Sequence, residues 1–129
     1  MKRVVITGIG IVSCLGNSQK EVYESLINSK SGITFSEEYK EYNLKSNIHG
    51  KPNIKLEDHV DRKVIRFMGE GSAYNYVAMN EAVKDSGLEE KDVSNISSGM
   101  IMGSGGPSIK NVILAADKTR EKNPKKMGP

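Results

Sequence analysis

The chain has 129 residues, of which 36% are hydrophobic and 27% charged, so it has the composition of a soluble globular protein with at most one domain. An aromatic content of 5% without tryptophan argues against a nucleic-acid-binding module that stacks bases. The net charge of +3 is uneven, because residues 110–129 carry +4 and residues 1–109 carry −1. A basic end on a near-neutral body favours an anionic contact, with solvated charge as the default interpretation.

The single cysteine, Cys14, excludes a disulfide framework and a cysteine-rich zinc site. His49 and His59 have no metal-ligand spacing to each other or to Cys14, and we interpret both as ordinary loop residues. No apolar run approaches the ~18 residues of a membrane span, and the N-terminus lacks the layout of a signal peptide. We therefore expect a cytoplasmic protein without membrane insertion, metal or cofactor.

An apolar run that ends in glycine predicts a buried strand over residues 2–10. Gly8, Gly10 and Gly16 invite comparison with a dinucleotide-binding loop, but the motif needs glycine where Ser13 stands. No helix pattern begins there either, so nucleotide binding is a distant third hypothesis.

Ser18 and Glu21 form a capping box for a helix that extends to about residue 28. Residues 33–58 are irregular and polar, which predicts a long surface excursion with one short strand at residues 46–50.

The longest helical pattern lies between Asp61 and Gly87, where apolar residues recur at helical spacing. Asp61 is placed to cap its start, and Gly87 to form a left-handed cap at its end. The apolar surface broadens along the helix, which is typical of a central helix with other layers packed around it. Gly69 and Gly71 each cost about 1 kcal/mol relative to alanine inside a helix, and therefore indicate a close approach by another element or a bend.

The first turns of this predicted helix carry Arg62, Lys63 and Arg66, with only Asp61 nearby to offset their charge. Cations at a helix N-terminus oppose the macrodipole by up to roughly 1 kcal/mol each. We infer that something other than helix stability, such as an acidic partner, favours them; the alternative is a solvated basic turn.

A charged turn at residues 89–92 precedes a second predicted buried strand at residues 98–102. That strand leads into a glycine-rich turn at residues 103–108, after which Ser108 is placed to cap a helix that Pro124 ends. A strand, a glycine turn and a helix N-terminus can together hold an anion or carbonyl, although the ending of a Walker loop is missing.

The predicted order is strand, helix, long helix, strand, helix, an α/β pattern with too few strands to cover the long helix. We therefore interpret residues 1–129 as part of a larger domain, without an internal boundary.

Four stretches resemble the β-ketoacyl-acyl carrier protein synthases, the elongating condensing enzymes of fatty acid synthesis. They are residues 1–13 (MKRVVITGIGIVS), 31–35 (SGITF), 61–68 (DRKVIRFM) and 102–106 (MGSGG). The last three are similar to the synthase I branch in particular, while synthase II and polyketide ketosynthases share the opening strand and remain open.

The resemblance implies a thiolase-like fold, with two similar halves that each contain a mixed five-stranded sheet, stacked in αβαβα layers. This chain would supply only the N-terminal part of the first half. The helix between Asp61 and Gly87 would then form the buried layer between the sheets, which accounts for its broad apolar surface.

The chemistry implied is decarboxylative condensation, in which malonyl-acyl carrier protein attacks an acyl group held on a cysteine thiolate at a helix N-terminus. The family's nucleophilic cysteine, two histidines and lysine lie beyond the matching region. Cys14 is interpreted as buried packing, and neither His49 nor His59 matches a catalytic motif. We expect no catalytic residue in this chain, an inactive fragment, and a full-length acyltransferase that is a homodimer.

The resemblance assigns Arg62, Lys63 and Arg66 to the basic patch with which synthase I enzymes grip the acidic helix of the acyl carrier protein. Lys125 and Lys126 are expected to join this patch from the partner subunit of a dimer.

Gly105, Gly106, Pro107 and Ser108 match the turn that lines the acyl pocket near the subunit interface. The branch usually has a third glycine where Pro107 stands. Because proline restricts φ and removes an amide donor, the resemblance leaves the acyl chain-length preference open.

Two hypotheses of different classes follow. The leading one is an N-terminal piece of a dimeric condensing enzyme. The alternative is a free-standing, non-catalytic module that binds an acyl carrier protein or pairs with a condensing enzyme. They differ in whether the chain continues into a strand and a cysteine-bearing helix start.

Overall fold

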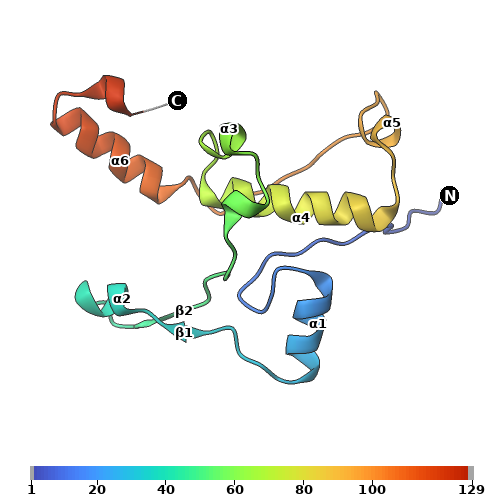
Figure 1. Ribbon diagram of the computed structural model, residues 1–129, viewed down its shortest axis with the longest axis horizontal. Helices are drawn as coiled ribbons and strands as arrows, with labels where there is room; N and C mark the ends of the chain where they lie inside the picture. The colour runs from blue at the N-terminus through green and yellow to red at the C-terminus, as the bar shows by residue number, and fades with distance from the viewer. Residues whose placement is uncertain (1, 128–129) are drawn as a thin grey trace.

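The computed structural model describes residues 2–127, in which short helices and one small sheet surround a central helix, α4 (Figure 1). The helices and strands are α1 (Gln19–Ile27), β1 (Thr34–Phe35), α2 (Glu37–Glu41), β2 (Ile48–His49), α3 (Arg62–Ile65), α4 (Glu70–Ser86), α5 (Glu90–Val93) and α6 (Ile109–Arg120), with 3₁₀ turns η1 (Leu56–Asp58) and η2 (Pro124–Lys126).

The helix predicted after Ser18 is α1, and its length is confirmed. The Ser18 hydroxyl accepts a hydrogen bond from the Glu21 amide at 3.3 Å. The Glu21 carboxylate accepts from the Asn17 amide at 2.8 Å instead of returning to Ser18, so the cap is shifted by one residue from a capping box. These two bonds satisfy the Glu21 amide, which the first turn of the helix leaves without a partner, and the Asn17 amide just before the helix.

The long excursion contains a two-stranded antiparallel sheet in which Thr34 opposes His49 and Phe35 opposes Ile48. A strand at residues 46–50 is therefore confirmed, although it is only two residues long. The short helix α2 was not predicted; Ser36 caps it by accepting from the Tyr39 amide at 3.3 Å. Polar composition concealed this helix, because its stability depends on the local cap rather than on an apolar stripe.

The prediction of one long helix between Asp61 and Gly87 is wrong, because the structure divides it into α3 and α4. Gly69 lies between them in an extended conformation, with ψ of 159°, and caps α4. Both predicted end caps are confirmed. Asp61 accepts from the Lys63 amide at 2.7 Å, and Gly87 adopts the left-handed region with φ of 69°.

The buried apolar core of the described residues consists of Val22, Val60, Ala73 and Val77. Two of these belong to α4, so this helix is central as predicted, but it is covered on one side only. Tyr76 and other apolar residues of α4 remain partly exposed. A helix with this apolar surface normally packs against further layers.

The two predicted buried strands are not formed. Residues 2–10 and 98–102 are extended but belong to no sheet, and Val4 and Ile101 are 91% and 98% exposed. A strand needs a neighbour for its amides and carbonyls, and neither segment has one among residues 2–127. The mixed helix and strand content agrees with an α/β class, while the αβαβα layering stays a prediction.

The N-terminal segment lies along α4, as Figure 1 shows. The Ile9 amide donates to Asp85 Oδ2 at 3.0 Å, and the Ile11 amide donates to Glu81 Oε2 at 2.8 Å. Gly10 is needed at this approach, because a β-carbon there would overlap the Ala78 carbonyl oxygen. The glycines of this segment therefore permit close backbone packing, which explains them without a nucleotide.

Hydrogen bonding lowers the pKa of Asp85, first from the Gln19 side chain and then from the Ile9 amide. A carboxyl group whose pKa is lower in the folded state stabilises that state above its unfolded pKa. This contribution is present at neutral pH and is lost as the pH falls through the lowered value.

Replacing Gly10 by alanine should destabilise the protein expressed from the complete gene by about 1–3 kcal/mol, because the new methyl group has no space against α4. Gly71→Ala is the matched control, since no atom lies within 4 Å of its added β-carbon. It should be neutral or stabilising by up to about 1 kcal/mol. Chemical denaturation measures both changes, and equal stability of the two variants would contradict the close approach.

Residues 1–129 in isolation should unfold without a cooperative thermal transition, because only four apolar side chains are buried in the described part of the chain. Circular dichroism during heating would measure this. A sharp two-state transition of the monomeric segment would contradict the expectation.

Candidate functional site

The basic segment Arg62, Lys63 and Arg66 occupies α3 and the residue that ends it. Buried Val60, which is 3% exposed, anchors the chain just before the segment. Asp61 then caps the helix, and all three cationic side chains are exposed. The sequence forms this element locally, with an apolar anchor, a cap and one helical turn.

Within residues 2–127, none of these three cations forms an ion pair. The Asp61 carboxylate is used by the helix cap, and Asp58 of the neighbouring turn η1 lies 3.7 Å from Lys55. The segment therefore presents a concentrated positive charge, which attracts an acidic surface.

The division of the long helix corrects the electrostatic argument for these cations. Because α3 has only four residues, Arg62 and Lys63 lie in its last turn as well as its first, and Arg66 is the C-terminal cap. Cations are favourable near a helix C-terminus. Opposition to a helix dipole therefore no longer indicates function here, and the docking role of this segment stays a prediction.

The predicted pocket turn, Gly105 to Ser108, is organised by the residue before it. The Ser104 hydroxyl donates to the Gly106 carbonyl at 2.6 Å and accepts from the Gly106 amide at 3.4 Å. Ser108 occupies the N-cap position of α6 as predicted, but its side chain makes no capping hydrogen bond. Pro107 is exposed between them.

The structure places the start of α4 beside the start of α6. A β-carbon on Gly69 would lie 2.9 Å from Ser108 Cβ, and Glu70 Oε1 lies 3.7 Å from Lys110 Nζ. The predicted close approach is confirmed at Gly69. Burial and then the nearby Glu70 carboxylate raise the pKa of Tyr74 in the same turn. Ser108, the last residue of the predicted pocket turn, is thereby brought next to Gly69, three residues after the basic segment ends, a link that the sequence pattern did not reveal.

Lys125 and Lys126 lie in η2, at the end of α6 that leads away from α4 (Figure 1). Both are exposed. Their contribution from a second subunit to the docking patch stays a prediction. Helix α6 ends at Arg120, before Pro124, which instead begins the η2 turn.

The cysteine and histidines do not converge. Cys14 is half-buried beside Gly32, whose added β-carbon would lie 2.8 Å from the thiol sulfur. His49 packs edge-on against Tyr39, with ring centroids 5.3 Å apart. The described residues hold no group of three histidine, cysteine or acidic side chains suited to a metal ion.

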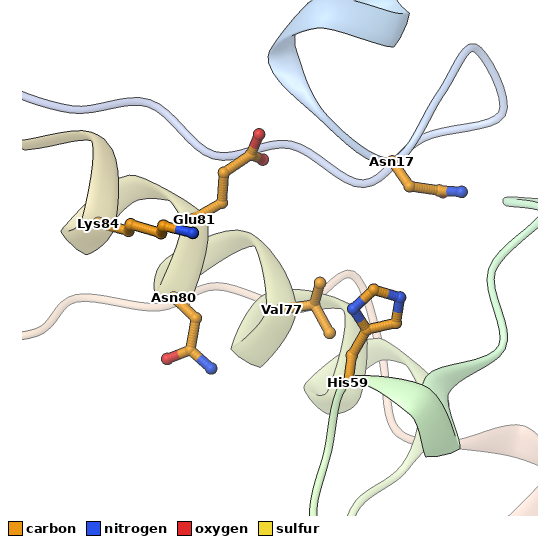
Figure 2. Close-up of a pocket in the computed structure, with 6 residues that line it drawn as sticks. All are labelled: Asn17, His59, Val77, Asn80, Glu81 and Lys84. Carbon is orange, nitrogen blue, oxygen red and sulfur yellow. The ribbon is translucent and has the colours of Figure 1, made fainter.

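His59 lines an open pocket between η1, α4 and the segment before α1 (Figure 2). The other lining residues are Asn17, Val77, Asn80, Glu81 and Lys84. Figure 2 shows the Glu81 side chain directed toward the N-terminal segment, where it accepts its two amide hydrogen bonds. The carboxylate is therefore occupied by a structural role, and sequence analysis gave no signal for it.

None of the helices in the described residues is long and apolar enough to cross a membrane.

Residues 1–128 match the family model of the beta-ketoacyl synthase N-terminal domain. The chain is 44% identical to 3-oxoacyl-[acyl-carrier-protein] synthase 1 of Haemophilus influenzae, over 100% of this chain and 32% of that protein. It is 45% identical to synthase 1 of Escherichia coli K12, over 93% of this chain and 30% of that protein. For synthase 2 of Staphylococcus aureus N315 the identity is 33%, over 99% of this chain and 31% of that protein.

The chain therefore belongs to the beta-ketoacyl synthase family, as its sequence motifs predicted. The higher identity to the synthase 1 proteins supports the synthase I-like branch. The chain spans about a third of the length of the curated relatives it matches. The thiolase-like fold of this family agrees with the predicted fold class.

Proposed function

We propose that this chain is the N-terminal segment of a 3-oxoacyl-[acyl-carrier-protein] synthase, an acyltransferase that condenses an acyl thioester with malonyl-acyl carrier protein in fatty acid biosynthesis. The observation that carries the proposal is the 44% identity to the Haemophilus influenzae synthase 1 over the whole of this chain. Composition and local structure agree with it but would not be sufficient alone.

The role of this segment is to dock the acyl carrier protein. Arg62, Lys63 and Arg66 are exposed and have no intramolecular acidic partner in residues 2–127, so their charge is available to a carboxylate-rich surface. Each exposed contact is worth only about 0.2–1 kcal/mol, but a cluster steers an acidic partner into place. In a homodimer, Lys125 and Lys126 of the second subunit extend the same patch.

The turn from Gly105 to Ser108 forms part of the acyl pocket near the subunit interface. Its support is the match to the family's motif, together with the place of Ser108 beside Gly69 at the start of α4. Pro107 restricts the backbone of this turn and removes an amide donor, so it bears on the shape of the pocket and leaves the acyl chain-length preference open.

Residues 1–129 do not perform the condensation themselves. The activated thiol for this chemistry belongs at a helix N-terminus. Cys14, by contrast, lies in a tight turn closed by Ser13 and Gly16, and α1 begins only at Gln19. The nucleophile is therefore supplied from outside residues 1–129, within a full-length protein that works in the cytoplasm without a cofactor.

The alternative is a non-catalytic module that binds an acyl carrier protein or pairs with a condensing enzyme. The exposed, self-contained α3 is the observation that favours it, since docking needs no residue from elsewhere. The intact mass of the protein expressed from its own gene separates the two. We expect a mass about three times that of 129 residues, in keeping with the third of its relatives that the chain spans. A mass that corresponds to 129 residues would favour the module.

Reversal of charge at Arg62, Lys63 and Arg66 to glutamate in the full-length protein should weaken carrier-protein binding by about tenfold, because attraction is replaced by repulsion. It should also reduce the dependence of binding on salt, with an unchanged thermal midpoint. Titration calorimetry at two ionic strengths measures both effects.

The matched control reverses three exposed lysines outside α3, each of which pairs with an acidic residue near it in the sequence. The change in net charge is the same as in the α3 variant. The three lysines are Lys20, Lys40 and Lys91. The control should alter affinity much less. Equal effects of the two triple variants would show that net charge alone is responsible, and unchanged affinity in the α3 variant at low ionic strength would contradict the docking role.

A further inference from the structure

The basic segment ends in a contact between a cation and an aromatic ring. The guanidinium carbon of Arg66 lies 4.7 Å from the centroid of the Phe67 ring. This distance is within the range of a cation–π interaction, which holds a guanidinium over the face of the ring. Phe67 is 59% exposed, so the pair lies at the surface beside the other two cations.

The backbone that carries this pair is held in a tight turn. The Phe67 amide donates to the Val64 carbonyl at 3.0 Å, and the Met68 amide donates to the Ile65 carbonyl at 3.0 Å. These i to i+3 hydrogen bonds continue α3 by a tighter turn up to Gly69, where the chain becomes extended. The two adjacent side chains are thus presented from a defined backbone and not from a loose loop.

The contact with the ring does not use the hydrogen-bond donors of Arg66. A guanidinium has five N–H groups, and a carboxylate partner in the same chain would occupy one or two of them. A ring face attracts the charge and leaves the N–H groups at the edge available. No acidic side chain in residues 2–127 pairs with Arg66, and its guanidinium lies over the Phe67 ring instead.

We propose that Phe67 is a positioning residue of the docking surface, which holds Arg66 ready for a carboxylate of the acyl carrier protein. The inference rests on the proposed docking function and names a residue that acts through Arg66. A long cationic side chain loses rotamer freedom when it binds, and an arginine that is already ordered loses less. The partner is acidic because the surface around the ring carries three cations without intramolecular acidic partners in the described residues.

The test uses the full-length protein and titration with its acyl carrier protein. Phe67→Leu removes the ring face but keeps an apolar side chain, and should weaken binding about two- to fivefold, the range for an exposed cation–π contact. Phe67→Tyr retains the ring and should bind as the parent protein does. The thermal midpoint should be the same for all three proteins. Loss of binding in both variants, or a lower midpoint that accounts for the loss, would overturn the proposal.

A double-mutant cycle with Arg66→Ala separates positioning from direct contact. If Phe67 acts through Arg66, Phe67→Leu should have no further effect once Arg66 is alanine. Additive losses would mean that the ring contacts the partner itself, which would overturn the proposal. Phe35→Leu is the control, because Phe35 is 53% exposed in β1 with no cation over its ring among the described residues.

The cycle also distinguishes this inference from the function it rests on. A loss of binding with Arg66→Ala but not with Phe67→Leu would overturn the positioning role and leave docking at α3 supported. Unchanged binding in Arg66→Ala and in the charge-reversed triple variant together would contradict docking, and the inference with it.

Discussion

The carboxylate of Glu81 joins three separate parts of this chain. It accepts the Ile11 amide at 2.8 Å and the Gln19 amide at 3.0 Å, so a side chain of α4 holds both the N-terminal segment and the first residue of α1. The second of these amides is one that a helix start leaves without a backbone partner, and a negative charge is favourable there. Close packing of Gly8 and Gly10 on α4 accompanies these bonds. The arrangement of residues 8–19 therefore depends on one face of one helix.

Elsewhere on the surface of the molecule, extended apolar segments are not covered by other elements of the described residues. Val4, Ile6 and Ile101 expose most of their apolar area from extended backbone that has no partner strand in the described residues. Scattered apolar residues are normal on a protein surface, but extended apolar segments without partners are aggregation-prone edges. Such segments are compatible with a stable protein when further strands cover them. This surface agrees with a chain that spans about a third of its curated relatives.

What the sequence predicted correctly is local. The caps at Ser18, Asp61 and Gly87 each depend on residues at most a few positions away, and all three formed. The prediction of two buried strands was wrong because a strand depends on neighbouring strands that are distant in the sequence. An apolar pattern indicates that a segment prefers burial, but it does not show whether a neighbouring strand is present. The break at Gly69 was visible as a costly glycine, but only the packing against Ser108 explains it.

The functional features of the family also differ in whether they depend on consecutive residues or on distant ones. The docking surface proposed at α3 needs only consecutive residues, an apolar anchor and a cap, so a segment with a small core can present it. Condensation needs a thiol at a helix N-terminus and groups that converge on it, which requires elements brought together from different parts of a chain. Consecutive residues are therefore sufficient for the proposed docking surface, whereas they are not sufficient for a condensation site. The unpaired charge of α3 fits a synthase and a binding module equally, whereas the contact between the start of α4 and the start of α6 concerns a second element. That contact brings Ser108 of the glycine turn beside Gly69, which follows the basic segment, so the two segments proposed for docking and for the acyl pocket are linked through the start of α4.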